Sequence, residues 1–298
     1  MRRPHNEKTV ELLRQFGELK MWRRGSERAP HKPLLLLLSL SRVASGQPRL
    51  TSFSELEEPL TRLLRYYGPP RKSAHPEYPF WRLQQDGLWE VVSAEPMRHR
   101  VSNNDPPRTE LRAKNAAGGF TQGVYDQLRK RPELIADLAK QLLNANFPSS
   151  IHEDILEEIG LSVEAEIRPR DPRFRAEVIR AYEHRCAVCK FDLKIGGSDF
   201  GLEAAHIKWH QAGGPDDVTN GIALCVIHHK ALDRGVIGLN EDLTIIISAD
   251  LHGQSWAKEW FEAFKGKVIS APTRAEWYPK VVHIRWHFEQ VFRRPPKE

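Results

Sequence analysis

The 298-residue chain has only three cysteines, and none of its apolar runs is long enough to cross a bilayer. A small, odd number of cysteines excludes the disulfide-dependent class of secreted domains. A transmembrane helix needs about 20 apolar residues, whereas the longest apolar stretch is centred on residues 34–38. The N-terminal residues carry charge but lack the apolar core of a signal peptide. We therefore expect a cytoplasmic protein.

Charge is divided unevenly along the chain, which is long enough for about two domains. Residues 1–150 hold 25 Lys and Arg against 16 Asp and Glu, and the remainder holds 20 against 23. A basic N-terminal half favours an acidic partner such as a nucleic acid. A solvated basic surface would give the same excess, so charge alone leaves both interpretations open.

The hydrophobic pattern predicts an α+β protein whose N-terminal domain is mainly helical with a small sheet. Apolar residues at helical spacing, capping signals and a leucine-rich run predict helices over residues 7–21, 34–46, 54–67 and 127–145. Ser54 is the expected N-cap of the third helix, with Glu57 at capping-box spacing. Short strands are expected over Phe80–Leu83 and Leu88–Val92, and a turn at Gly118-Gly119.

A change in composition predicts the domain boundary. The segment 147–173 has prolines at both ends and an acidic middle, which is typical of a linker. We expect a first domain over 1–150, a linker over 151–172 and a second domain over 173–298. In the second domain, a helix over 174–184 and a strand over 243–248 are expected.

The three cysteines lie in two short clusters. Cys186 and Cys189 form a C-x-x-C, and Cys225 is followed three residues later by His228. Two such knuckles supply four thiolate or imidazole ligands, the set that structural Zn²⁺ requires. Because the pattern uses every cysteine in the chain, it favours a Cys₃His zinc site over ordinary buried cysteines.

Further polar residues surround this pattern: His206, Asn220, His229 and Asp233. Their order resembles that of the HNH (ββα-metal) nucleases over about 50 residues. In that family a His ends a strand, an Asn follows in the connection and a second His lies on the next helix. The resemblance assigns these roles to His206, Asn220 and His229. Asp233, four residues after His229, would share its helix face.

The resemblance implies metal-dependent hydrolysis of a phosphodiester. His206 would take a proton from water, and Asn220 would hold the connecting loop. His229 and Asp233 would bind the catalytic Mg²⁺ or Mn²⁺. Many family members carry Asp or His immediately before the catalytic His, where this chain has Ala205. Glu203 is either a substitute ligand or a salt-bridge residue.

The N-terminal half carries a second resemblance, on His31-Lys32-Pro33 and on the segment from Tyr78 to Arg82 (YPFWR). These residues look like the sulfur-binding domain of McrA-type, phosphorothioate-dependent endonucleases. The resemblance implies an apolar cup for sulfur containing Tyr78 and Pro79, with His31, Lys32 and Arg82 as polar DNA contacts. An aliphatic residue completes the cup in relatives. Arg82 occupies one of the positions where it is expected, and Ala116 or Ala117 is another candidate. A proline-broken core segment is the simpler alternative.

Together these patterns predict a type IV restriction endonuclease that recognises phosphorothioated double-stranded DNA and cuts nearby. A homodimer is one way to cut both strands. Two alternatives stay open at this point. One is an HNH endonuclease that reads methylated DNA, such as 5-methylcytosine, or unmodified sequence; the other is a non-catalytic, zinc-stapled DNA-binding protein.

Overall fold

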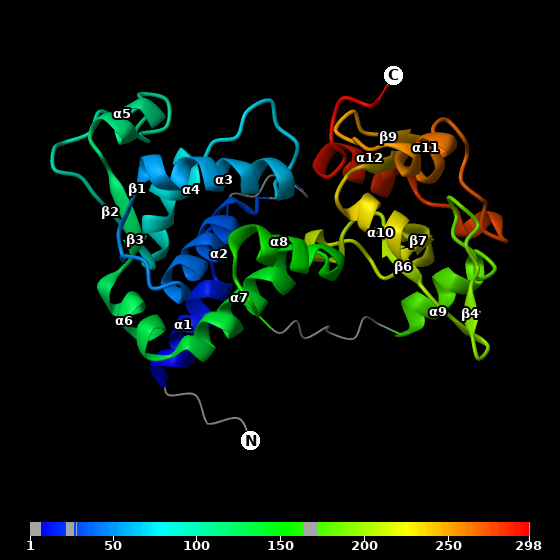
Figure 1. Cartoon of the computed structure of the whole chain (residues 1–298), viewed down its shortest axis with the longest axis horizontal. Helices are drawn as coiled ribbons and strands as arrows, with labels where there is room; N and C mark the ends of the chain where they lie inside the picture. Colours follow the sequence, from blue (N-terminus) through cyan, green and yellow to red (C-terminus); the bar gives the residue numbers. More distant parts are fainter. Residues whose placement is uncertain (1–6, 22–26, 28, 164–171, 298) are drawn as a thin grey trace. The chain divides into compact units, whose positions relative to one another are not determined.

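A computed structural model of the chain describes residues 7–21, 27, 29–163 and 172–297. The chain divides into two units, drawn in Figure 1. The described residues of the first unit are 7–21, 29–146 and 152–163, and those of the second are 27, 147–151 and 172–297. None of the helices in these ranges is long and apolar enough to span a membrane.

The first unit is mainly helical and contains one small sheet. Its helices are α1 (Glu7–Gly17), α2 (His31–Ala44), α3 (Phe53–Tyr67), α4 (Glu77–Arg82), η1 (Leu83–Asp86), α5 (Arg108–Ala113), α6 (Gln122–Lys130), α7 (Pro132–Asn146) and α8 (His152–Ile159). Its strands are β1 (Thr51–Ser52), β2 (Trp89–Val92) and β3 (Ala117–Phe120).

Helix α2 forms the core of this unit. Its leucines at positions 34–38 and 40 are all buried, and it packs against α3, α4, α6, α7 and α8. A helix that is apolar on every side must be surrounded by other elements. The leucine-rich run therefore folds as the predicted buried helix.

The sheet is antiparallel with strand order β1-β3-β2. Gly118 and Gly119 lie inside the central strand β3, so the predicted turn at this position is wrong. A Cβ at Gly118 would lie 2.8 Å from the rings of Phe80 and Trp89, and one at Gly119 would lie 1.9 Å from the carbonyl oxygen of Arg49. These glycines therefore allow close packing instead of a change in chain direction.

Three further local predictions differ from the structure. The expected strand over Phe80–Leu83 is helical, within α4 and η1. The expected helix over 127–145 is split at Pro132, because proline lacks the N–H that a continuous helix would use. The side chain of Ser52, not that of Ser54, caps α3 by accepting a hydrogen bond from the N–H of Glu55.

The second unit combines short helices with two-stranded sheets. Its helices are η2 (Ser149–Ile151), α9 (Pro172–Ala181), η3 (His210–Ala212), η4 (Val218–Asn220), α10 (Val226–Asp233), α11 (Ser255–Trp260), η5 (Glu262–Phe264), η6 (Ala275–Trp277) and α12 (Val281–Gln290). Its strands are β4 (Lys194–Ile195), β5 (Ser198–Asp199), β6 (Leu202–His206), β7 (Gly221–Cys225), β8 (Ile237–Leu239) and β9 (Ile245–Ile247).

Strands β6 and β7 pair antiparallel, from Leu202 opposite Cys225 to His206 opposite Gly221, and α10 follows directly. Both strands contact α9 and α10. A Cβ on Gly221 would lie 2.3 Å from Val178 of α9, so glycine lets α9 approach the end of the hairpin. The expected α+β class is confirmed, and this unit has the ββα order of elements.

The predicted division of the chain at residues 150 and 172 stays a prediction. The segment expected to be a linker contains α8, which packs on α2 and α3 of the first unit. Residues 164–171, which include most of the Arg-Pro-rich end of that segment, lie outside the described residues.

Candidate functional site

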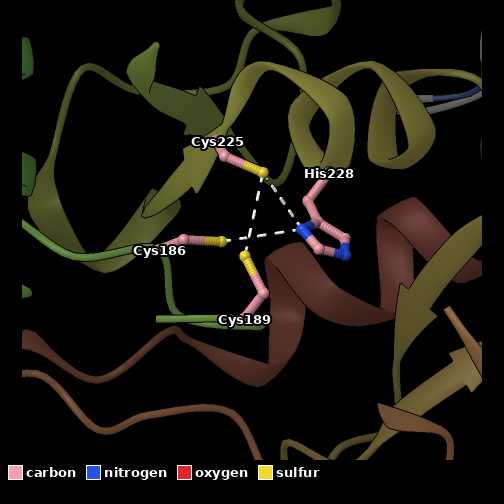
Figure 2. Close-up of side chains that lie close together, drawn as sticks. All are labelled: Cys186, Cys189, Cys225 and His228. Atoms are coloured by element: carbon pink, nitrogen blue, oxygen red, sulfur yellow. Dashed lines mark hydrogen bonds between the residues drawn. The ribbon is translucent and has the colours of Figure 1, made fainter. Parts of the chain in front are cut away.

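All four predicted zinc ligands come together. The ligand atoms of Cys186, Cys189, Cys225 and His228 lie within 4.8 Å of one another, and Figure 2 shows the four side chains pointing inward. Nδ1 of His228 is 3.1 Å from Sγ of Cys225 and 3.7 Å from Sγ of Cys186. Sγ of Cys189 lies 3.9 Å from Sγ of Cys225.

The orientation of His228 suits a metal ligand. Its Nε2–H donates to the carbonyl oxygen of Trp260 at 2.8 Å, while Nδ1 faces the sulfurs. A carbonyl only accepts, so this bond assigns the proton to Nε2 and directs the lone pair of a neutral imidazole at the cluster. Phe261 and Phe264 approach the ring edge-to-face, and His228 is fully buried.

The electrostatics of the cluster call for a cation. Hydrogen bonds from Cys189 and Cys225 lower the pKa of Cys186, and the same contact with Cys186 raises the pKa of Cys189. Burial lowers the pKa of His228, but its contacts with Cys186 and Cys225 outweigh burial and raise that pKa to about 10. Three adjacent thiolates are unfavourable without a positive charge among them, and a divalent ion supplies it. The donor set fits zinc.

His206 lies at the end of β6, against α9. Its ring stacks on Phe174, with centroids 4.0 Å apart and planes inclined by 14°. Its Nε2 lies 2.7 Å from Oδ1 of Asp216, in the loop that connects β6 to β7. The side chain is 12% exposed, so the imidazole is held on several sides while part of it reaches solvent.

Asn220 is fully buried and holds the same loop. Its Oδ1 accepts from the N–H of Lys208 at 2.8 Å, and its Nδ2 donates to the carbonyls of Lys208 and Pro215 at 2.9 and 3.0 Å. All three bonds are to backbone groups, which is the loop-holding role predicted for this residue.

His229 lies between two carboxylates. Its Nδ1 is 2.5 Å from Oε2 of Glu203, and its Nε2 is 3.1 Å from Oδ2 of Asp233. The hydroxyl of Ser150 also donates to Asp233. His229 and Asp233 are both buried, whereas the side chain of Glu203 is 44% exposed. Glu203 thus contacts His229 directly, and both roles considered for Glu203 place it beside this histidine.

The structure brings His229 and Asp233 together, as predicted, but in direct contact. Among the described residues, the Cys₃His set is the only group of three or more His, Cys, Asp or Glu side chains whose ligand atoms are close enough to hold one metal ion. Ala205, where a further ligand was expected, is fully buried. Mg²⁺ commonly uses one or two carboxylates together with substrate phosphate and water, so a two-residue protein site is chemically sufficient.

In the first unit, Tyr78 and Arg82 lie together on α4. The guanidinium of Arg82 lies 4.6 Å from the centroid of the Tyr78 ring, and that of Arg100 lies 5.5 Å from it. The ring of His75 stacks on Tyr78 at 4.9 Å. Tyr78 is half-buried, and the next residue, Pro79, is buried. This arrangement is a basic, aromatic surface; we call these five residues the Tyr78 cluster.

Carboxylates hold this cluster in place. Both Nε and Nη2 of Arg82 donate to Oδ2 of the buried Asp105, at 2.8 and 2.5 Å. Glu77, also buried, accepts from Arg100 and Arg108 at 3.2 Å and contacts His75 at 3.1 Å. Arg82 thus lies beside Tyr78 and binds a partner, Asp105, that its position in the sequence did not suggest.

Lys32, which was predicted to contact DNA, lies in the interior of the first unit. Lys32 is buried, and its Nζ donates to Oδ2 of Asp86 at 2.5 Å and to the carbonyl of Lys20 at 2.7 Å. The side chain of Lys32 is 10% exposed and that of Arg82 is 36% exposed, so Lys32 is the less accessible of the two to a phosphate. His31, the first residue of α2, is half-buried.

A comparison with models of protein families identifies two families that this chain matches. The family model of the ScoMcrA-like DNA sulfur-binding domain matches residues 9–164, more than half of the chain. The chain belongs to this family. A model of HNH endonucleases matches residues 186–240, which span the Cys₃His cluster, the β6–β7 hairpin and α10. Both predicted resemblances are therefore confirmed, and the protein is an HNH nuclease joined to a sulfur-binding domain.

Solved structures of this family are similar to the chain. The sulfur-binding domain of ScoMcrA, complexed with phosphorothioated DNA, is 28% identical and covers 53% of this chain and 97% of its own, with a TM-score of 0.45. The sulfur-binding domain of SprMcrA in the same kind of complex is 24% identical, with coverage of 51% and 94% and a TM-score of 0.44.

The type IV phosphorothioation-dependent restriction endonuclease ScoMcrA is 27% identical to this chain, with a TM-score of 0.43. The match covers 57% of this chain and 31% of that one. No curated protein matches the chain.

Sequence reasoning missed two site residues, Asp105 and Asp216. Each lies more than nine residues from its partner along the chain, in an irregular segment. Asp216 falls in a Gly-Gly-Pro-Asp-Asp run between His206 and Asn220. An acidic pair inside the connection of an HNH motif is the signal that could have found it.

Proposed function

We propose that this protein is a phosphorothioate-dependent restriction endonuclease. Its first unit would bind duplex DNA that carries a phosphorothioate, and its HNH domain would hydrolyse a phosphodiester nearby. The observation that carries the proposal is the match of residues 9–164 to the DNA sulfur-binding family, in one chain with an HNH domain. We further propose a recognition domain over 1–150, a linker over 151–172 and a nuclease domain over 173–298.

The Tyr78 cluster supports recognition of sulfur on a phosphate. Sulfur is larger and more weakly hydrated than oxygen, so an apolar contact favours it, while a phosphate oxygen would lose its hydration without compensation. The half-buried Tyr78 supplies apolar surface, the buried Pro79 adjoins it in the chain, and Arg82 and Arg100 supply positive charge beside the Tyr78 ring. When DNA binds, Arg82 would exchange its contact with Asp105 for a contact with the anionic DNA backbone.

The HNH domain has the parts that hydrolysis requires. His206 would remove a proton from water, whose oxygen forms a bond to phosphorus as the ester oxygen leaves with its electron pair. Asn220 keeps the loop beside His206 in place. A divalent Mg²⁺ or Mn²⁺ ion bound through His229 and Asp233 would supply positive charge at the phosphate. Zn²⁺ in the Cys₃His cluster would be structural.

A binding comparison tests the recognition half. The full chain is titrated with three sets of duplexes that share the same sequences. One set is unmodified, one is methylated, and one carries phosphorothioates, with every dinucleotide step represented. We expect the tightest binding to phosphorothioated DNA, and loss of that preference in Tyr78→Ala. The matched control is Tyr66→Ala, which removes an exposed tyrosine from α3 of the same unit.

Equal binding to phosphorothioated and plain duplexes would contradict the proposed recognition. Preference for methylated duplexes would favour an HNH enzyme that reads another modification. A Tyr78→Ala variant that keeps its sulfur preference would show that the sulfur is bound elsewhere in the domain.

A further inference from the structure

Asp216 contacts the imidazole of His206 directly. Its Oδ1 lies 2.7 Å from Nε2, and its Oδ2 lies 3.9 Å from Nε2 of His210. Asp216 is ten residues beyond His206 along the chain, so only the folded loop brings them together. At this distance the contact is a charge-assisted hydrogen bond.

The loop that carries Asp216 has a fixed path. The side chain of Asn220 binds the backbone at Lys208, near the start of the loop, and at Pro215, the residue before Asp216. Gly214 packs so closely against the carbonyl of Lys208 that a Cβ would lie 1.9 Å from it. The position of Asp216 relative to His206 is therefore set by buried contacts of neighbouring residues.

The carboxylate determines which nitrogen of His206 carries the proton. An ionised Asp only accepts hydrogen bonds, so the facing Nε2 must be protonated. In the neutral imidazole the lone pair is then on Nδ1. The stack on Phe174 fixes the plane of the ring as well, so its tautomer and its orientation are both determined.

We propose that Asp216 is a positioning residue for the HNH reaction: it holds His206 in the tautomer that accepts a proton at Nδ1. This inference rests on the proposed function. An O–H bond of water breaks and its proton goes to Nδ1, while the oxygen bonds to phosphorus and the ester oxygen leaves with its electron pair. The imidazolium that results is stabilised by the adjacent carboxylate, as in catalytic triads.

The neighbouring aspartate has a different task. Oδ1 of Asp217 accepts from the N–H and the hydroxyl of Thr219, at 2.8 and 2.5 Å, and these bonds lower the pKa of Asp217. Asp217 therefore caps η4 and stabilises the loop, whereas Asp216 faces the imidazole. The two adjacent residues allow the same substitution to be compared at both positions.

The experiment measures single-turnover cleavage of phosphorothioated duplex by the full-length protein, across pH, for wild type, His206→Ala, Asp216→Asn, Asp216→Glu and Asp217→Asn. For Asp216→Asn we expect about a 100-fold slower chemical step, the scale that misplacement of a catalytic group produces. Its DNA affinity should be unchanged. Asp216→Glu should recover part of the rate, because it restores the carboxylate.

The pH profile separates positioning from stability. A nearby carboxylate raises the pKa of an imidazole, and His206 acts as a base only above its pKa. Loss of the charge at Asp216 should therefore move the acid limb of the profile to lower pH. Asp216 and His210 are titratable groups close to this imidazole, while α9 presents Phe174 and β7 presents Gly221. Asp217→Asn should lower the melting temperature and leave the profile in place.

The outcomes distinguish this inference from the proposed function. If wild type cleaves and His206→Ala does not, a wild-type rate and profile in Asp216→Asn overturns the role of Asp216 alone. Equal losses of rate in Asp216→Asn and Asp217→Asn also overturn it, because the loop and not the pair would then matter. A wild-type protein that cleaves none of the duplexes overturns both.

Discussion

The side chain of Asn220 binds both backbone groups of Lys208, twelve residues earlier in the chain. Its Oδ1 accepts the N–H at 2.8 Å and its Nδ2 donates to the carbonyl at 2.9 Å. A side-chain amide thus replaces a backbone partner and closes the loop beside His206. At this side-chain length only asparagine carries both an amide N–H donor and a carbonyl acceptor. Aspartate keeps the acceptor but loses the donor when it is ionised.

Asn220→Asp should therefore destabilise the loop although it is nearly isosteric. The carboxylate still accepts from Lys208 but no longer donates to the carbonyls of Lys208 and Pro215, and each buried polar group left unsatisfied costs about 1–3 kcal/mol. We expect a lower melting temperature together with loss of cleavage, measured by calorimetry and by single turnover. Cleavage at the wild-type rate would mean that the loop does not need this closure.

Removal of the metal from the Cys₃His cluster should unfold the second unit. Structural zinc contributes on the order of 10 kcal/mol in isolated zinc fingers, and the cluster holds every cysteine of the chain. We expect one zinc per chain by elemental analysis. Chelation or Cys225→Ser should remove the thermal transition of this unit.

The structural zinc ion and the catalytic divalent ion can be distinguished by adding metals back after chelation and measuring stability and cleavage separately. Zn²⁺ should restore stability, and cleavage should then require added Mg²⁺ or Mn²⁺ as well. A stable, zinc-free protein, or recovery of the fold by Mg²⁺ alone, would refute a structural zinc site.

Glu77 should make the first unit sensitive to acid. Burial alone would raise its pKa, but hydrogen bonds from its own backbone N–H and from His75, with the charge of Arg108, lower the pKa below its ordinary value of 4.5. A carboxylate with a lowered pKa stabilises the fold above its unfolded pKa, and this contribution is lost as pH falls through the folded pKa.

Glu77→Gln should accordingly reduce stability at pH 7, and the difference from wild type should shrink as the pH falls below 4.5. Denaturant melts of the full chain at several pH values measure this. Glu133→Gln, at an exposed position of α7, is the control and should follow wild type. A Glu77→Gln melt parallel to wild type at every pH would contradict the linkage.

Substitution of Lys32 should lower the stability of the protein and leave its DNA affinity unchanged. Removal of one partner of a buried ion pair leaves the other charge uncompensated, at a cost of about 3–5 kcal/mol. We expect this loss in Lys32→Met, and partial recovery when Asp86→Leu is added. Lys130→Met, at an exposed position of α6, serves as the control. A folded Lys32→Met variant with much weaker DNA binding would restore the original assignment of Lys32.

The parts of the site that local spacing determines could be predicted from the sequence. Cys186 and Cys189 are close because two residues separate them, and the same holds for Cys225 and His228, so the sequence already contains both halves of the cluster. The buried helix over 31–44 follows equally from its uninterrupted leucines.

Partners joined by loops could not be predicted in this way. Asp216 reaches His206, and Asp105 reaches Arg82, only after irregular segments have folded. Lys32 appeared basic and exposed in the sequence because its partner Asp86 is 54 residues away. Gly118 and Gly119 resembled a turn because close approach and chain reversal favour the same residue.

The most direct test of the central claim is cleavage of matched duplexes, with and without a phosphorothioate, by wild type and by His206→Ala in the presence of Mg²⁺ or Mn²⁺. Wild type should cut the phosphorothioated duplex alone, and His206→Ala should bind it equally well without cutting it. Equal cutting of both duplexes, or undiminished cutting by His206→Ala, would contradict the account.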